Sequence, residues 1–146
     1  MYNNRIIKFR AWMNDSMFYN HSVSLEIDGT VHFLDTDGNW EVDYKNERVI
    51  LMQYTGLKDK SGKEIYEGDI LHFQTYEGGG FGKVGIECYA EVVYGHHNLT
   101  DNCLYGSQGF YLLTSKSQRP SSISYWIKSH NALVAGNIHD NPELIN

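Results

Sequence analysis

The sequence predicts a mainly β fold, and its composition, its apolar pattern and its turn residues all support that prediction. Tyrosine accounts for 11 of the 146 residues, and aromatic residues make up 14% of the chain. Aromatic and β-branched side chains suit the half-buried surface of a sheet. Short apolar runs are separated by Gly, Asn and Asp, which favour the turns between strands. We therefore expect a small, partly open β-barrel after an N-terminal antiparallel meander, with little helix, and an α+β arrangement as the alternative.

The length of the chain favours one domain over residues 1–146, with a single hydrophobic core. A chain of this size buries roughly 68–70% of its extended surface on folding, so it needs no disulfide or metal for stability. Its two cysteines, Cys88 and Cys103, have no CxxC spacing, and the first residues do not resemble a leader peptide. No run approaches the roughly 18 apolar residues that a membrane-spanning helix needs. We expect a cytoplasmic protein with reduced thiols and no membrane role.

The net charge argues against broad nucleic-acid binding. Twelve Lys and Arg face 18 Asp and Glu, which gives −6 with neutral histidines. Because nucleic-acid affinity comes largely from neutralised phosphates, an acidic chain needs a local basic patch to bind DNA or RNA. The one local basic cluster lies at Lys58–Lys63, where three lysines outnumber Asp59. We interpret it as a solvated turn, with phosphate contact as the alternative.

The first third of the chain predicts the meander. Asp28 and Gly29 have the residue types of a tight type I′ hairpin turn, and Asn14–Ser16 and Asp35–Gly38 are expected to be turns as well. A more buried, central strand is expected at 49–54, because apolar residues occupy consecutive positions there. The strands expected before it are 6–12, 17–27, 30–34 and 40–44.

The stretch Leu51–Leu71 combines a buried strand, two turns and the start of another strand. Three glycines provide backbone shape at the turns, Asp69 opens the next strand, and the core receives Ile65, Tyr66, Ile70 and Leu71. We expect the charged residues here to serve solubility. The functional alternative is a binding surface for a protein or a phosphate. The structural residues of this motif are Gly56, Gly62, Gly68 and Asp69; the binding candidates are Tyr54, Lys58, Lys60, Lys63 and Tyr66.

The remainder of the chain alternates strands with polar connections. Glycines predict a loop at 75–82, and 95–108 has the length of a functional or disordered connection. Strands are expected at 84–94, 109–114 and 132–138. One or two helical turns are expected at 124–131, and Pro142 suits the first position of a final turn or short helix.

Metal and catalytic signals are weak. His96, His97 and Cys103 form the tightest group of potential ligands, with Cys88 and Asp101 as possible additions. Zinc sites favour short, paired Cys and His spacings, and adjacent histidines in a strand point apart. The GGGFGK run lacks the Ser or Thr that a phosphate-binding loop places after its lysine. We expect no metal, no cofactor and no catalytic residue.

Three blocks of the sequence resemble the YopX family of bacteriophage and prophage proteins. They are IKFRAW at 7–12, LMQYTGLKDKSGKEIYEGDI at 51–70 and GNIHDNPEL at 136–144. Small departures lie at Ser61, His139 and Asp140, and 84–135 is similar only in being rich in strands. The resemblance implies a mainly β fold, a phage or prophage origin and an intracellular setting in a bacterial host. It does not imply a known activity.

The function hypothesis that follows is a non-enzymatic phage accessory protein. It would act through protein contacts with itself or with a phage or host protein, and a homo-oligomer using aromatic-rich β surfaces is the first expectation. The alternative is a nucleic-acid-binding module in phage DNA metabolism or regulation, with the basic turn and its neighbouring tyrosines on the binding face. An enzyme with an unfamiliar site is the least expected class.

Overall fold

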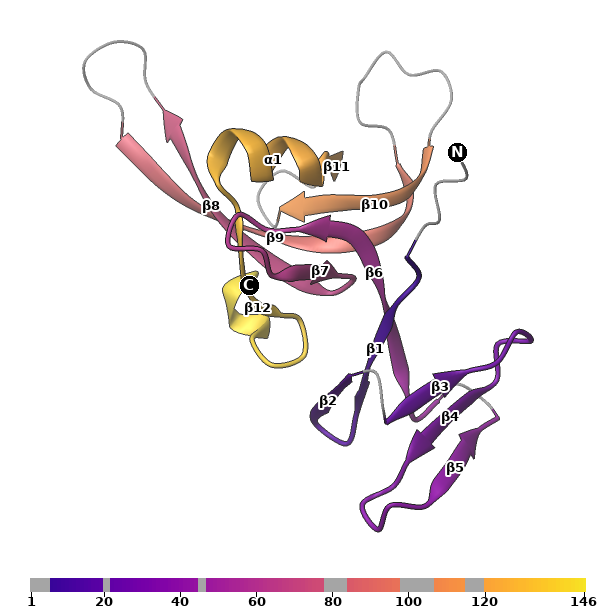
Figure 1. Ribbon diagram of the computed structural model, residues 1–146. Coiled ribbons are helices and arrows are strands. Elements are labelled where there is room, and N and C mark those ends of the chain that lie inside the picture. The colour runs from indigo at the N-terminus through magenta and orange to yellow at the C-terminus, as the bar shows by residue number, and fades with distance from the viewer. Residues whose placement is uncertain (1–5, 20–21, 45–46, 78–83, 98–106, 115–119) are drawn as a thin grey trace. The chain divides into compact units, whose positions relative to one another are not determined.

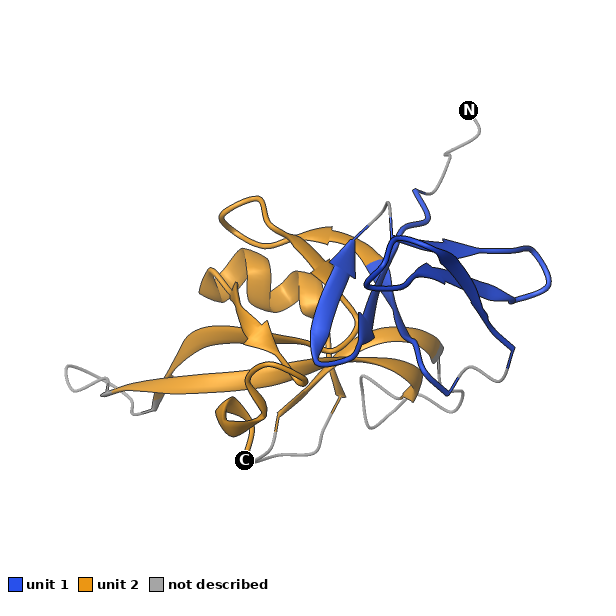
Figure 2. Cartoon of the chain, turned by 90° about the horizontal axis from the view of Figure 1, so that it is seen from below, with its two compact units in different colours: residues 1–54 blue, residues 55–146 orange. Residues whose placement is uncertain are grey.

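The protein is mainly β with little helix, as predicted. The computed structural model describes residues 6–19, 22–44, 47–77, 84–97, 107–114 and 120–146 (Figure 1). The chain divides into two compact units, residues 1–54 and 55–146 (Figure 2). The buried residues that the structure describes form two hydrophobic clusters, one in each unit. The single hydrophobic core expected from the chain length is therefore not found among them. The single domain over 1–146 stays a prediction.

Unit 1 consists of short antiparallel strands. β1 pairs with β2 on one side and with β6 on the other, and β3, β4 and β5 form a three-stranded sheet in sequence order. The predicted N-terminal meander is thereby confirmed. The single strand expected at 17–27 is wrong, because its two ends pair with different partners as β2 and β3. The strands are β1 (Phe9–Met13), β2 (Ser16–Tyr19), β3 (Val23–Leu25), β4 (Val31–Leu34), β5 (Trp40–Asp43) and β6 (Ile50–Lys58), which continues into unit 2.

The tight type I′ turn lies between β1 and β2. Asn14 and Asp15 have φ of 49° and 55°, and the residues on either side of them, Met13 and Ser16, are paired across the hairpin. A type I′ turn requires positive φ at both central residues, and Asn and Asp are among the residues that tolerate it best. The pair therefore forms this turn without a glycine.

The predicted type I′ turn at Asp28–Gly29 is wrong. Only Gly29 has positive φ, at 91°. Its N–H donates to the Glu26 carbonyl at 3.0 Å, and the Glu26 N–H donates to the Thr30 carbonyl at 2.9 Å. These two bonds define a three-residue loop, in which a type I turn is followed by a left-handed glycine. The same bonding pattern recurs at 35–39 and 59–63, with Gly38 and Gly62 in the glycine position.

The core of unit 1 lies between its two groups of strands. Val31 and Phe33 of β4 pack with residues of β1 and with Val49, which precedes β6. The carboxylate of Asp43 holds the connection before β6, because it accepts the backbone N–H groups of Glu47, Arg48 and Val49 at 3.0–3.3 Å. The buried residues of this core are Ala11, Met13, Val31, Phe33 and Val49.

Unit 2 is built on a five-stranded antiparallel sheet with the order β11-β10-β9-β8-β12. β6 lies between β1 and β7 in the four-stranded sheet β2-β1-β6-β7, which confirms its expected central position. The expected fuller burial is wrong, because full burial alternates along the strand at Met52 and Tyr54, and Ile50 at its start is 49% exposed. The other elements are β7 (Glu64–Tyr66), β8 (Asp69–Glu77), β9 (Val84–His97), β10 (Ser107–Thr114), β11 (Pro120–Ser121), α1 (Ile123–His130), β12 (Leu133–Asn137) and a short 3-10 helix, η1 (Pro142–Leu144).

Helix α1 covers one face of this sheet (Figure 1). Ile123, Trp126 and Ile127 recur at helical spacing and pack on the core side. Trp126 stacks on Phe73 of β8, with ring centroids 4.3 Å apart. The helix ends where Asn131 takes a left-handed conformation and its N–H donates to the Trp126 carbonyl. The core beneath it includes Ile65, Leu71, Phe73, Ala90, Val92, Leu112 and Ala132.

Two predicted loops are shorter than expected. β8 continues to Glu77, and β9 continues to His97. The reason is the pairing between neighbouring strands: β8 pairs with β9 as far as Glu77 and Val84, and β9 pairs with β10 as far as His97 and Ser107. The remaining parts of those expected loops, 78–83 and 98–106, lie outside the described residues.

Candidate functional site

The residues proposed as a binding surface divide into two groups. Lys58, Lys60 and Lys63 are exposed, whereas Tyr54 and Tyr66 are only 6% and 5% exposed. The Tyr66 hydroxyl donates to the Glu64 carboxylate at 2.9 Å. The tyrosines therefore belong to the interior, and only the lysines are open to a partner. Whether those lysines bind anything stays a prediction.

Asp59 gives the basic turn its shape. One carboxylate oxygen accepts the Ser61 N–H, the Ser61 hydroxyl and the Lys63 N–H at 2.7–2.9 Å, and the other accepts the Val134 N–H at 2.9 Å. Burial raises the pKa of Asp59, but these hydrogen bonds outweigh it and leave the pKa below its usual value. The expectation that charges in this segment serve solubility is wrong for this buried residue. Asp59 joins the turn to β12.

The three glycines and the aspartate named as structural residues of Leu51–Leu71 lie where the backbone conformation or a backbone hydrogen bond requires these residue types. Gly56, Gly62 and Gly68 have φ of 85°, 92° and 75°, a region that side-chain-bearing residues avoid. Asp69 is buried, and its carboxylate accepts the Tyr66 N–H at 2.8 Å across the turn. The segment is thus held by backbone geometry and by two buried carboxylates.

The adjacent histidines at the end of β9 face different surroundings. His96 is exposed, whereas His97 is buried and its Nδ1 lies 3.2 Å from the Gly95 carbonyl oxygen. Cys103 and Asp101 lie outside the described residues. In the part of the chain that the structure describes, no group of three or more His, Cys, Asp or Glu side chains is arranged to hold a metal ion.

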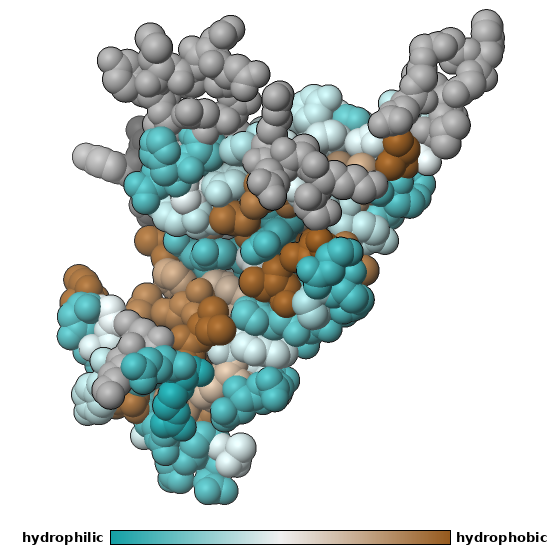
Figure 3. Space-filling view, turned by 180° about the vertical axis from the view of Figure 1, so that it is seen from behind, coloured by the Kyte–Doolittle hydropathy of each residue, from teal (hydrophilic) through white to brown (hydrophobic). Residues whose placement is uncertain are grey.

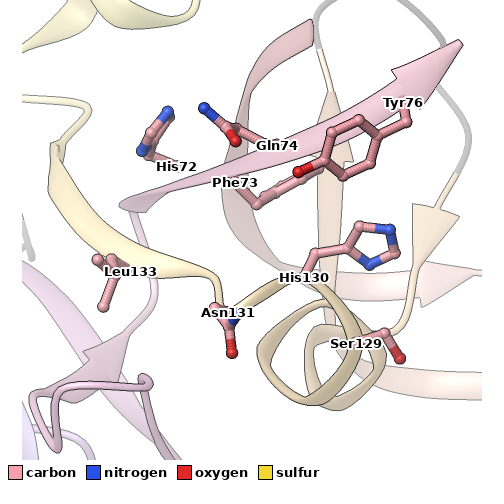
Figure 4. A pocket seen from close by; sticks show the side chains of 8 residues that line it. All are labelled: His72, Phe73, Gln74, Tyr76, Ser129, His130, Asn131 and Leu133. Atoms are coloured by element: carbon pink, nitrogen blue, oxygen red, sulfur yellow. The ribbon is translucent and has the colours of Figure 1, made fainter. Parts of the chain in front are cut away.

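A pocket of about 320 Å³ lies at the edge of β8 (Figure 4). Strand β8 contributes residues from both of its faces, and the end of α1 and the start of β12 contribute the rest. Figure 4 shows Tyr76 and His130 on neighbouring sides of the space, with Leu133 at the start of β12. The lining residues are His72, Phe73, Gln74, Tyr76, Ser129, His130, Asn131 and Leu133.

The strand register explains why the pocket is there. β12 pairs with β8 only between Asp69 and His72, where Leu133 is the last partner. On its other side, β8 remains paired with β9 as far as Glu77. The left-handed turn at Asn131 directs the chain from α1 into β12 at that point. The outer edge of Phe73–Glu77 has no strand partner among the described residues, and the pocket opens onto this edge.

A polar cluster occupies the face of β8 away from α1. The Glu87 carboxylate of β9 accepts from the Gln74 amide and contacts the His72 ring. The hydrogen bonds from Gln74 and then His72 lower the pKa of Glu87. The His72 ring also lies against Tyr89, with centroids 4.9 Å apart. Such cross-strand contacts fix the side chains beside the pocket.

Aromatic rings occupy the other side of the pocket. Trp126 lies between Phe73 and His130, with ring centroids 4.3 Å and 4.4 Å away. The Nδ1 atom of His130 is buried and has no hydrogen-bond partner among the described residues. Tyr76, in contrast, is 58% exposed. The pocket therefore combines a fixed aromatic wall with one exposed aromatic side chain.

Sequence reasoning missed this site for a specific reason. A glycine-rich loop was expected from Thr75, so the end of β8 was not recognised as a strand edge. The alternation of Phe73 and Thr75 with Gln74 and Tyr76 was the available signal. It could indicate a strand, but not that β12 stops short of it.

The fold and the site define a mainly β protein with a helix-covered antiparallel sheet and an open strand edge. A family model described as YopX protein matches residues 8–146, and the chain belongs to the YopX family. The predicted resemblance is thereby confirmed.

A solved structure is similar over nearly the whole chain. The crystal structure of protein EF1440 from Enterococcus faecalis has a TM-score of 0.56 and 26% sequence identity, with 98% of this chain and 100% of that chain covered. The search of curated proteins gave no match. Among the described residues, no helix has both the length and the apolar character needed to cross a membrane.

Proposed function

We propose that this protein is a non-enzymatic, phage- or prophage-encoded accessory module that acts through protein contacts in the cytoplasm of a bacterial host. The observation that carries the proposal is the edge of β8 over Phe73–Glu77, which has no strand partner in the part of the chain that the structure describes, together with its adjoining pocket. Unpaired strand edges present backbone groups that another chain can pair with. Aromatic residues such as Tyr76 are the side chains that interfaces favour.

Exposed apolar and aromatic residues elsewhere support the same proposal. Apolar residues form separate patches among polar surface in Figure 3. In unit 2, Tyr94, Tyr125 and Leu133 are each more than two-fifths exposed, in addition to Tyr76. Trp40 of β5 and Ile50 of β6 are about half exposed in unit 1. Larger groups of such residues mark interaction surfaces more often than isolated ones do.

The test is the mass of the protein in solution. Light scattering over a concentration series should give a mass above that of the 16.8 kDa monomer, because the first expected partner is another copy. If the mass stays monomeric, tagged protein should recover one defined phage or host protein from induced cells. A monomer that recovers none would contradict the proposal.

A nucleic-acid-binding module is the second candidate, and the basic turn favours it. Its three lysines are exposed while the carboxylate of Asp59 is buried and occupied by hydrogen bonds. Tyr54 and Tyr66 are buried, so this face would contact phosphates without stacking on bases.

Binding to single- and double-stranded DNA at increasing salt tests this candidate. Phosphate contacts predict an affinity that falls steeply with salt, with a slope that decreases by about one for each contact removed. Replacing Lys58, Lys60 and Lys63 with Gln should flatten that slope. Binding that is absent, or that does not respond to salt, would exclude the candidate.

A further inference from the structure

We propose that β8 pairs with β8 of a second copy of this chain, antiparallel over Phe73–Glu77, in a symmetric dimer. This inference rests on the proposed function, since it names the partner and the surface. The pairing joins the five-stranded sheets of two copies into one continuous sheet through the edge that β12 leaves uncovered.

The residues of this edge lack the usual protection against pairing. Exposed strand edges are commonly guarded by lysine, proline, a bulge or an inward-pointing charge. From Phe73 to Tyr76 the edge carries no charge and no proline, and its register with β9 is unbroken. Phe, Thr and Tyr all favour strands. An edge of this composition is suited to be covered by another strand.

The free edge is also complementary to itself. In an antiparallel pairing centred on Thr75, Phe73 lies opposite Glu77 of the second copy, and Gln74 lies opposite Tyr76. The two Glu77 carboxylates then lie at opposite ends of the interface, so no like charges face each other. The pairing uses the whole of Phe73–Glu77 and stops where the partnership of β12 begins at His72. A two-fold axis through Thr75 makes the contact isologous, so the dimer is closed.

The pocket provides a place for Tyr76 of the second copy. In this register that side chain is directly opposite Gln74 and diagonal to His72, and both of these residues line the pocket. Opposite and diagonal neighbours on one face of a sheet are within reach of an aromatic ring. The 58% exposed tyrosine would be covered, and the pocket filled, in both copies at once. Glu87 is already bonded to His72 and Gln74, so its charge does not face the incoming ring uncompensated.

Disulfide trapping tests the register. Thr75→Cys places two cysteines across the two-fold axis, where paired Cα atoms lie about 4.5–5.5 Å apart and within disulfide range. Both natural cysteines are first replaced with Ser, because Cys88 lies 3.5 Å from the Thr75 hydroxyl and could react with the new thiol. The control is Ile86→Cys in the same background, since Ile86 pairs with Thr75 one strand in from the edge.

Mild oxidation should convert Thr75→Cys, but not Ile86→Cys, into a reducible covalent dimer. If both variants cross-link equally slowly, the pairing through β8 is wrong. If the protein is nevertheless an oligomer in solution, the proposed function stands and the contact between copies lies on a surface other than the β8 edge.

Sedimentation equilibrium of Tyr76→Ala provides a second measurement. The dimer dissociation constant should rise about tenfold or more, as expected for truncating a central aromatic side chain of a small interface. Tyr94→Ala is the matched control, because that tyrosine is 45% exposed and lies on β9 beyond Glu91, at the opposite end of the β8–β9 pairing from Phe73–Glu77. Circular dichroism should show both variants folded. A wild type that stays monomeric at all concentrations, or equal effects of both variants, would overturn the proposal.

Discussion

Asp59 is the residue whose removal should affect the central segment most. Its buried carboxylate accepts four hydrogen bonds, one of them from Val134 of β12. We expect Asp59→Ala to lower the free energy of unfolding by about 2–4 kcal/mol, because four part-buried hydrogen bonds lose their acceptor together. Urea denaturation followed by circular dichroism measures the change.

Two further variants show whether the loss of stability in Asp59→Ala comes from its hydrogen bonds, from its charge or from its place in the turn. Asp59→Asn keeps one carbonyl oxygen but presents an amide nitrogen to a neighbouring donor, so its loss should be smaller and still clear. Lys60→Ala removes an exposed neighbour and should change stability by less than about 0.5 kcal/mol. Similar losses in Asp59→Ala and Lys60→Ala would show that the hydrogen bonds contribute little.

Gly136 lies where a side chain has no room. A Cβ atom there would overlap the side-chain amide of Asn141, and Gly136 adjoins the irregularity in the β12–β8 register. We expect Gly136→Ala to destabilise the protein by about 1–3 kcal/mol through this overlap. Thermal unfolding measures the loss. Combining it with Asn141→Ala should recover much of the stability, whereas additive effects of the two changes would exclude the overlap as the cause.

At the scale of elements, a substitution in the turn between β1 and β2 should increase the stability of this hairpin. Asp15 has φ of 55°, a conformation that glycine adopts without steric strain. Asp15→Gly would create Asn-Gly, the preferred pair for a type I′ turn, and should stabilise the hairpin by about 0.5–1 kcal/mol. Asp15→Ala should destabilise it, because alanine cannot bond locally in this conformation. Chemical denaturation compares the three proteins, and equal stability of the two variants would contradict the turn assignment.

The same elements show how far the sequence alone could lead. The strand at Glu64–Tyr66, the turn at Asp59–Lys63 and the helix at Ile123–His130 follow from local residue types and spacing. The ends of β8 and β9 do not, because pairing of β8 with β9 and of β9 with β10 extends both strands into polar residues. The split between β2 and β3 arises because each strand forms a hairpin with a different neighbour, β2 with β1 and β3 with β4. Local patterns therefore predict which elements exist better than where they end.

The candidate site was harder to predict because it depends on the sheet order. Its pocket joins β8 with residues more than 50 positions later, at the end of α1 and the start of β12. No local sequence pattern indicates that the pairing of β12 with β8 ends at His72. The five proposed binding residues were chosen by their proximity in sequence. The burial of Tyr66 agrees with the core position that was also expected for it, and buried Tyr54 ends the strand expected to be central.

For the whole molecule, the free energy of unfolding should decrease at acidic pH. Hydrogen bonds lower the pKa values of Asp28 and Asp35, and Asp59 is also lowered although its burial acts the other way. A carboxylate with a depressed folded pKa stabilises the protein above its unfolded value. That stabilisation is lost as the pH falls through the folded pKa. The free energy of unfolding should therefore decrease below about pH 4, and less so in Asp59→Asn.

Glu91 should contribute to the pH dependence with the opposite sign. Its burial in β9, and secondarily the charge of Glu67, raise the pKa of Glu91 above its ordinary value. The folded protein therefore favours protonated Glu91, and this favourable term is lost as the pH rises through the folded pKa. Glu91→Gln removes the penalty of the buried charge, so the variant should be more stable than wild type at pH 7. The difference should shrink toward zero below about pH 4, where both side chains are neutral. Urea unfolding at a series of pH values measures both curves, with Glu87→Gln as a control because hydrogen bonds lower the pKa of that carboxylate. If Glu91→Gln is less stable than wild type at pH 7, then the ionised carboxylate of Glu91 stabilises the fold through a contact stronger than its burial penalty.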